Sequence, residues 1–155
     1  MTAHEEITQA LLRYCRGIDR MDAELVRSAY HDDAVDDHGD AFSGSIDAYL
    51  AWVMPVLAER FTSTMHTLSN VSIELDGDRA HVESYLVAYH VVAGDEALRV
   101  LGARYVDDFT WRDGVGWRIQ HRRLVPEWQL QQRGFVAVPG VAAPARRDAG
   151  DPSYG

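Results

Sequence analysis

Apolar residues recur at helical spacing in the N-terminal part of the chain. An apolar stripe follows Thr2 and Glu5, which are spaced as in a capping box, and together they predict a helix from about Ala3 to Ile18. The stripe consists of Ile7, Leu11, Leu12, Cys15 and Ile18. Asp22 is suited to cap a second, shorter helix over residues 23–30.

A polar stretch separates these helices from a third one. Residues 31–44 read HDDAVDDHGDAFSG, which is rich in turn-forming residues and predicts a loop with a short strand around Val35. Ser45 begins a helix over residues 46–61, and Pro55 lies inside it, where we expect a kink or a break.

Beyond His66 the apolar positions alternate as in strands. Residues 68–75 and 80–92 flank a DGD turn and predict one hairpin, and residues 98–112 and 117–125 flank a DGVG turn and predict another. Helices followed by antiparallel strands predict an α+β domain, with the helices packed on one face of a curved sheet that encloses a pocket. We place this domain at residues 1–138, followed by an aperiodic tail rich in Pro, Gly and Ala at residues 139–155.

Charge and cysteine content narrow the function. The net charge of −9 argues against nucleic acid and against an anionic membrane surface as partners, because both attract clustered Lys and Arg. The N-terminal segment is acidic and amphipathic without a long apolar run, so it predicts neither a secretory signal nor a membrane span. The single Cys15 forms no internal disulfide, and a cytoplasmic location is the simplest interpretation.

Tyr14 and Asp19 are the first candidates for chemistry. Five residues separate them, which is about 140° around an ideal helix, so they share a site only if the helix unwinds near Gly17. The alternative is that Tyr14 is a core aromatic residue and Asp19 a cap for the next segment. The sequence leaves both interpretations open.

His66 is the third candidate, at the junction of a helical and a strand-like segment. A neutral imidazole is well matched to removing a proton near pH 7, and it needs a carboxylate to fix its tautomer. Asp19 is that partner if the first helix ends over the mouth of the sheet. Otherwise His66 is a hydrogen-bonded histidine at a strand start.

Arg122 is the fourth candidate. Strand alternation in residues 117–125 places Trp117 and Ile119 on one face and Arg122 on the other. The arginine then faces solvent, a neighbouring subunit, or a pocket where it holds an anion.

The acidic residues around His31 and His38 suggest a metal site at first sight. Their spacing matches neither an EF-hand loop nor an H-E-x-x-H helix, so a solvated acidic loop is the favoured interpretation. The sequence also lacks a glycine-rich phosphate loop and a G-x-S-x-G elbow, and we expect no cofactor and no metal.

Three segments resemble the SnoaL-like branch of the nuclear transport factor 2 superfamily. They read YCRGIDRMDAELVRSAYHDDAV, MHTLSNVSIELDGDRAHVESYLVAYH and RYVDDFTWRDGVGWRIQHR, and the resemblance extends from the first helix to about Val125. It is greatest to the group of scytalone dehydratase, bile acid 7α-dehydratase and hexachlorocyclohexane dehydrochlorinase. In that group an Asp closes the first helix and a His opens a strand, in the positions of Asp19 and of His66, with Asn70 after it.

The resemblance implies a cone of helices against a strongly curved sheet, and a cofactor-independent lyase that works by elimination. His66 is then the base, Asp19 its partner, and Tyr14 or Arg122 the group that assists the leaving group, although the bile acid enzyme has its arginine further along that strand. We expect a small hydrophobic substrate, aromatic or polycyclic, bound in an apolar pocket. The expected wall residues are Tyr30, Trp52, Leu86, Ala88, Leu101 and Tyr105.

Other functions occur on the same scaffold. They include aldol-type polyketide cyclases, carbon–carbon lyases that release formaldehyde, structural β subunits of dioxygenases and ligand carriers. Apolar residues on both faces of the predicted strands, such as Leu86 and Tyr85, also predict a homo-oligomer, a trimer before a dimer.

Overall fold

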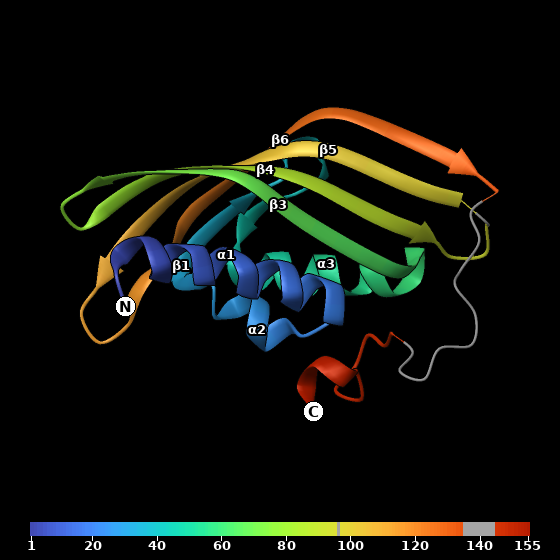
Figure 1. Cartoon of the computed structure of the whole chain (residues 1–155), viewed down its shortest axis with the longest axis horizontal. Helices are drawn as coiled ribbons and strands as arrows, with labels where there is room; N and C mark the ends of the chain where they lie inside the picture. Colours follow the sequence, from blue (N-terminus) through green and yellow to red (C-terminus); the bar gives the residue numbers. More distant parts are fainter. Residues whose placement is uncertain (96, 135–144) are drawn as a thin grey trace.

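The protein is described by a computed structural model covering residues 1–95, 97–134 and 145–155. Its helices lie together against one face of a curved sheet (Figure 1). The main helices are α1 (Ala3–Arg20), α2 (Ala23–Arg27) and α3 (Ile46–Arg60), and short 3₁₀ turns occur at η1 (Gly39–Ala41) and η2 (Pro152–Tyr154). Within the described residues, no helix is both long and apolar enough to cross a membrane.

The sheet has six strands in the described part of the chain, in the order β2-β1-β6-β5-β4-β3. β1 pairs with β6 in parallel, and the other neighbours are antiparallel, so the sheet is mixed. Its ends do not join, which leaves β2 and β3 at the edges. The strands are β1 (Tyr30–Asp37), β2 (Ser43–Ser45), β3 (Phe61–Asp76), β4 (Arg79–Val92), β5 (Ala97–Arg112) and β6 (Gly116–Arg133).

The predicted helices are present, with corrected ends. Thr2 and Glu5 form the capping box of α1. Ile7, Leu11, Cys15 and Ile18 of its apolar stripe are buried, whereas Leu12 is 48% exposed. α2 is shorter than predicted, because the chain enters β1 at Tyr30. Pro55 lies inside α3 without dividing it.

α1 does not unwind at Gly17, although unwinding was one of the two possibilities that the sequence left open. The helix continues through this residue to Arg20. A Cβ at Gly17 would lie 2.6 Å from Cγ2 of Val26 and 2.7 Å from its backbone nitrogen. The missing side chain therefore lets α2 pack closely on α1. Glycine is used here for close packing and not to break the helix.

Irregularities in the strands bend the sheet. The register of β3 against β4 shifts between Ser69 and Ser72, where Asn70 takes a left-handed conformation with φ of 49°. Asparagine tolerates this conformation better than most residues, and an extra residue in one strand increases local bending. The concave face that results carries buried side chains of β4, such as Leu86 and Ala88, toward the helices.

The C-terminal segment is partly outside the described residues, including the predicted boundary at residues 138 and 139. Residues 145–155 pack at the C-terminal end of α1, near α2 (Figure 1). Arg20 Nη1 donates to Asp151 Oδ2 at 2.8 Å, and Tyr154 Oη donates to Asp22 Oδ2 at the same distance. This part of the predicted tail is therefore attached to the domain.

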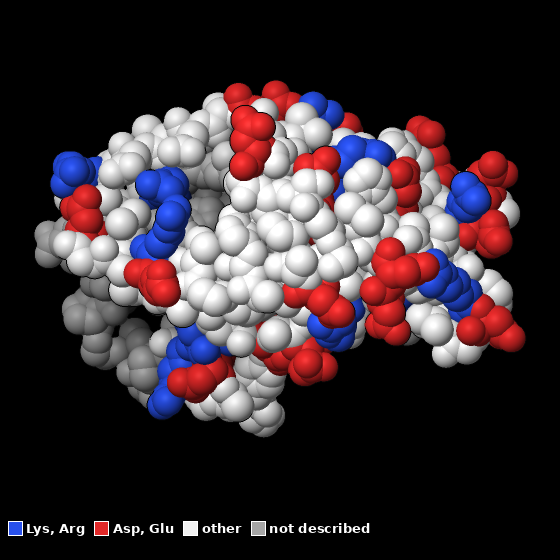
Figure 2. Space-filling model, turned by 180° about the vertical axis from the view of Figure 1, so that it is seen from behind, with Lys and Arg blue, Asp and Glu red and all other residues white. Residues whose placement is uncertain are grey.

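Charged side chains of both signs are interspersed over the surface. On the face shown in Figure 2, acidic residues outnumber basic ones and no broad basic patch gathers among the described residues. This distribution agrees with the net charge of −9.

Candidate active site

Asp19 contacts both the side chain and the backbone of His66. The carboxylate Oδ1 lies 2.7 Å from Nδ1 of the imidazole, and Oδ2 accepts the backbone N–H of His66 at 2.9 Å. Thr64 Oγ1 donates a third hydrogen bond to Oδ1 at 3.0 Å. The side chains of His66 and Asp19 are therefore in direct hydrogen-bonding contact, and both are largely buried.

The position of β3 explains why Asp19 can do this. β3 is an edge strand, so alternate backbone N–H groups point away from β4 and lack a partner within the sheet. The last turn of α1 lies beside β3 and brings Asp19 to one of these free donors, that of His66. The carboxylate of Asp19 thus accepts the free backbone N–H of the edge strand with one oxygen and orients the imidazole of His66 with the other. Because an ionised carboxylate only accepts, Nδ1 must carry the proton, and the lone pair of the neutral ring lies on Nε2.

A cavity of about 150 Å³ lies between the concave face of the sheet and the helices, and His66 is one of its walls. The lining is mostly aliphatic and aromatic. Aliphatic walls come from Ile18, Val53, Val56, Leu57, Leu86, Ala88, Leu101 and Leu124, and aromatic walls from Tyr14, Tyr49, Trp52, Phe61 and Tyr105. An apolar lining with few polar groups is typical of a site for a small hydrophobic molecule.

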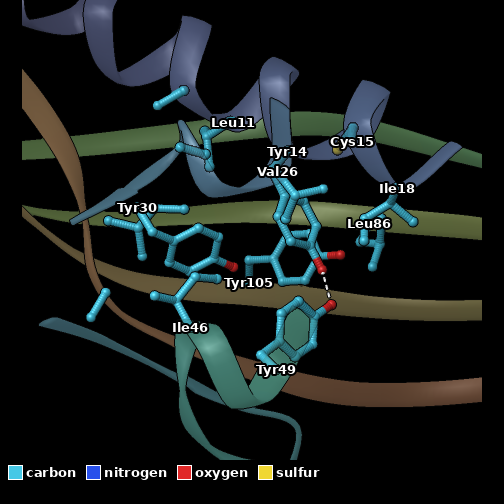
Figure 3. Close-up of a cluster of buried hydrophobic side chains, with 14 of the residues drawn as sticks. Leu11, Tyr14, Cys15, Ile18, Val26, Tyr30, Ile46, Tyr49, Leu86 and Tyr105 are labelled. Carbon is cyan, nitrogen blue, oxygen red and sulfur yellow. Dashed lines mark hydrogen bonds between the residues drawn. The ribbon is translucent and has the colours of Figure 1, made fainter. Parts of the chain in front are cut away.

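Two tyrosines from different helices meet at this cavity. The hydroxyls of Tyr14 on α1 and Tyr49 on α3 share a hydrogen bond of 2.7 Å, drawn as the dashed line in Figure 3. Burial raises the pKa of Tyr14 and of Tyr49, so both hydroxyls are hydrogen-bond donors rather than acids near neutral pH. Asp19 is not among the cavity-lining residues; it stands behind His66, while Tyr14 lines the cavity directly.

Arg122 is not placed as predicted. Its side chain is completely buried and forms two hydrogen bonds to Asp107, from Nε at 2.8 Å and from Nη2 at 2.7 Å. Although burial acts to lower it, the Asp107 carboxylate raises the pKa of Arg122 well above its usual value. The guanidinium lies 4.2 Å from the ring centre of Tyr14 and 3.8 Å from that of Tyr105, and Arg122 is not among the described residues that line the cavity.

The prediction that Arg122 faces opposite to Ile119 is also wrong. Phe109 pairs with Ile119 and Asp108 with His121, so Gln120 is an extra residue in β6. Such a bulge resets the alternation, and Ile119 and Arg122 are both buried on the inner face.

The expected pocket walls divide clearly. Trp52, Leu86, Ala88, Leu101 and Tyr105 all line the cavity. Tyr30 is not among its walls, because its hydroxyl turns to Asp36 at 2.6 Å and its ring is buried beside that of Tyr14.

Two further histidines, His38 and His90, line the cavity and were not among the predicted site residues. His38 Nδ1 lies 2.5 Å from Oδ1 of Asp36. The prediction of a solvated loop over residues 31–44 does not hold, because most of these residues form β1 and β2. His90 lies edge-on to His66 with ring centres 5.7 Å apart, and burial, together with the nearby His66, lowers the pKa of His90 to about 4. Asp36 and His38 form a D-x-H pattern at the end of β1, where the alternation of a strand brings residues two apart to one face. This pattern was the available signal for His38.

The composition of residues 31–44 also suggested a metal site. Within residues 1–95, 97–134 and 145–155, no three His, Cys, Asp or Glu side chains are arranged to hold a metal ion.

Known proteins share this architecture. A hexachlorocyclohexane dehydrochlorinase from Novosphingobium barchaimii superimposes with a TM-score of 0.80 at 18% identity, over 88% of this chain and 94% of that one. A protein of Novosphingobium aromaticivorans provisionally assigned as a scytalone dehydratase gives 0.73 at 19% identity, over 92% and 95%. A nuclear transport factor 2-like protein of Salmonella enterica gives 0.73 at 18% identity, over 92% and 96%. Among curated proteins, no sequence matches this chain.

Helices against a strongly curved, open sheet with a pocket between them define the cone-shaped α+β fold of the nuclear transport factor 2-like superfamily. Within it, residues 1–123 match the family model of the SnoaL-like domain. The chain belongs to the SnoaL-like family.

Proposed function

We propose that this protein is a cofactor-independent lyase, in which His66 removes a proton from a carbon atom next to a carbonyl or similar activating group. The observation that carries the proposal is the double contact of Asp19 with His66 at the wall of an apolar cavity. It leaves Nε2 of His66 without a hydrogen-bond partner among the described residues, which is the condition for a base to reach a ligand.

Elimination begins with the transfer of one proton from carbon. His66 Nε2 takes the proton from carbon, the electrons of that C–H bond form a carbon–carbon double bond, and the bond to the leaving oxygen or halide breaks. Asp19 stabilises the imidazolium that results, as the carboxylate does in other His–carboxylate pairs. Hydroxyls of Tyr14 and Tyr49 are placed to donate hydrogen bonds to negative charge that develops on the activating group.

The cavity favours a substrate with one ring. An apolar cavity of about 150 Å³ is large enough for a benzene-sized molecule. A polycyclic substrate would extend beyond it. The proposed substrate is therefore a small hydrophobic molecule whose single ring occupies the cavity.

The test uses aryl ethers of a β-hydroxyketone, 4-hydroxybutan-2-one, which lose a phenol when a proton is removed next to the ketone. We expect the wild-type protein to release nitrophenolate from the para-nitrophenyl ether, and His66→Gln to lower that rate by roughly 10²-fold or more. His81→Gln is the matched control, because His81 also contacts a carboxylate, Asp108, but on the exposed surface.

The outcomes separate the candidate functions. Retention of more than about a tenth of the rate in His66→Gln would refute the base assignment, since general-base catalysis contributes about 10²–10⁴-fold. Binding of the ether without release of phenolate would favour a ligand carrier instead. Release of formaldehyde from a ketone with a hydroxymethyl group on its α carbon would favour a carbon–carbon lyase. Ring closure of a linear polyketide mimic would favour a cyclase.

We also propose that the protein is a homo-oligomer, a trimer before a dimer, through the outer face of the sheet. Tyr85 and Tyr89 of β4 and Trp128 and Leu130 of β6 are large apolar side chains with 39–52% of their surface exposed. Exposed apolar patches of this kind mark interaction surfaces. Sedimentation at micromolar concentration tests the proposal, and a monomer would contradict it.

A further inference from the structure

A second histidine–carboxylate pair faces the same cavity as His66. His38 follows β1 directly, and its Nδ1 lies 2.5 Å from Oδ1 of Asp36. Asp36 is completely buried, and its other oxygen accepts the hydroxyl of Tyr30 at 2.6 Å. The carboxylate thus accepts one hydrogen bond on each oxygen from the described residues. It fixes the His38 ring with Nε2 unpaired among those residues, as Asp19 does for His66.

Aromatic rings hold His38 from the sides. Its ring stacks on Tyr49 with centres 5.2 Å apart and planes 26° apart, and it meets Trp52 edge-on at 6.3 Å. The His38 side chain is 13% exposed, and it lines the cavity together with His66. A ring-sized ligand in a cavity of about 150 Å³ is therefore within reach of both imidazoles.

The proposed elimination lacks an acid for the leaving group. Burial raises the pKa of Tyr14, which makes its hydroxyl a poor proton source. Arg122 is bound to Asp107 and stands behind the rings of Tyr14 and Tyr105. Neither of the two residues expected to serve the leaving group supplies a proton there.

We propose that His38 is the general acid of this site and that its Nε2–H gives a proton to the departing oxygen. This rests on the proposed lyase function. In the step, His66 gains the proton that leaves carbon, the C–O bond breaks, and the leaving oxygen takes the proton from His38. His38 ends neutral and His66 protonated, and exchange of one proton each with water restores the starting state.

The surroundings of His38 favour the acid role for it and leave the base role to His66. Asp36 is a buried carboxylate, and a buried charge needs a charged partner. Arg122 is hydrogen-bonded to Asp107, and among the described residues His38 is the basic side chain in direct contact with Asp36. Protonated His38 is therefore the counter-charge of Asp36 in the proposed mechanism. The aromatic face of Tyr49 also favours a cation stacked on it. Asp36 and Tyr30 act as positioning residues, since both work through His38.

A series of aryl ethers of 4-hydroxybutan-2-one tests the acid, because a basic leaving phenol needs a proton more than an acidic one. For His38→Gln we expect less than about a tenfold loss with the para-nitrophenyl ether but about 10²-fold or more with the para-methoxyphenyl ether. Asp36→Asn should lower the rates in the same order as His38→Gln but by smaller factors. It should also move the alkaline limb of the pH–rate profile to lower pH, because His38 loses the carboxylate that stabilises its protonated form. His66→Gln should lower all ethers by a similar factor.

An equal loss for all ethers in His38→Gln would refute the acid assignment, since it would mean that His38 only shapes the cavity. A steep dependence of the wild-type rate on the acidity of the phenol would also refute it, and this measurement needs no variant. If His66→Gln keeps wild-type rates, the assignment of His66 as the base is refuted, independently of the results for His38→Gln. Thermal unfolding of each variant shows whether it is folded under the assay conditions.

Discussion

Asp19→Asn tests the arrangement of the His66 site most directly, because the amide has nearly the same shape and a different set of hydrogen bonds. Three donors point at the carboxylate: His66 Nδ1–H at 2.7 Å, the His66 backbone N–H at 2.9 Å and Thr64 Oγ1–H at 3.0 Å. A carboxylate accepts on both oxygens, whereas an amide accepts on one and donates from the other.

Either orientation of the new amide disturbs the site. With the amide oxygen toward Nδ1 and Thr64, the NH₂ group faces the backbone N–H of His66, and one donor on the edge strand is left unpaired, at a cost of about 1–3 kcal/mol. With the amide reversed, the NH₂ group faces Nδ1, and the imidazole must move its proton to Nε2. That tautomer has no lone pair toward the cavity and is not a base. In both orientations the negative charge that stabilises the imidazolium is lost.

We therefore expect Asp19→Asn to lower kcat by roughly 10²–10⁴-fold. This corresponds to about 3–5 kcal/mol at 1.36 kcal/mol per factor of ten. The rate is measured on the para-nitrophenyl ether, and nitrogen NMR of the labelled imidazole reports which ring nitrogen carries the proton.

Asp108→Asn is the matched control, because Asp108 contacts His81 at 3.3 Å on the exposed surface, and its rate should stay near that of the wild type. Wild-type kcat in Asp19→Asn, with Nδ1 still protonated, would refute the reasoning that the carboxylate supports His66 as a base.

Three smaller predictions concern the surrounding residues. Tyr14→Phe should lower kcat by less than Asp19→Asn, since loss of one hydrogen bond to a developing charge is worth about 2–4 kcal/mol at most; an equal loss in kcat would give Tyr14 a larger role. Asp107→Asn should lower the free energy of unfolding in urea by about 3–5 kcal/mol, because it leaves the Arg122 guanidinium buried without its counter-charge, and an unchanged midpoint would contradict this. His90 has a pKa lowered from 6.5 to about 4, so the unfolded chain binds its proton more readily in that range, and stability falls as the pH drops from 6.5 toward 4. His90→Gln should remove up to about 3 kcal/mol of that fall, and unfolding curves with the same pH dependence as the wild type would show that His90 is not its source.

Local patterns in the sequence determined the regular elements. The capping box at Thr2 and Glu5 set the start of α1, because its hydrogen bonds join residues three apart. Alternation in β4 correctly separated inward Leu86 and Ala88 from outward Tyr85, because side chains along a strand point to opposite faces. These features depend on neighbours in the chain, so one sequence is enough to predict them.

Asp19 and His66 are 47 residues apart in the sequence, so periodicity could not predict that they meet. The resemblance to a family did predict it. Periodicity also failed at Arg122, because one extra residue in β6 reverses the faces of the strand and only pairing with β5 shows it. The role of Gly17 could not be predicted from periodicity, because it depends on the close approach of α2.

Tertiary structure alone decided what the acidic stretch of residues 31–38 does. The sequence shows acidic residues and two histidines there, a composition typical of a solvated loop. Pairing of β1 with β6 in parallel buries Asp36 and turns His38 toward the cavity. Burial is a property of what packs on a residue from elsewhere in the chain. For that reason the charge pattern predicted the exposure of Asp32 and Asp33, and only the fold made Asp36 the buried partner of His38.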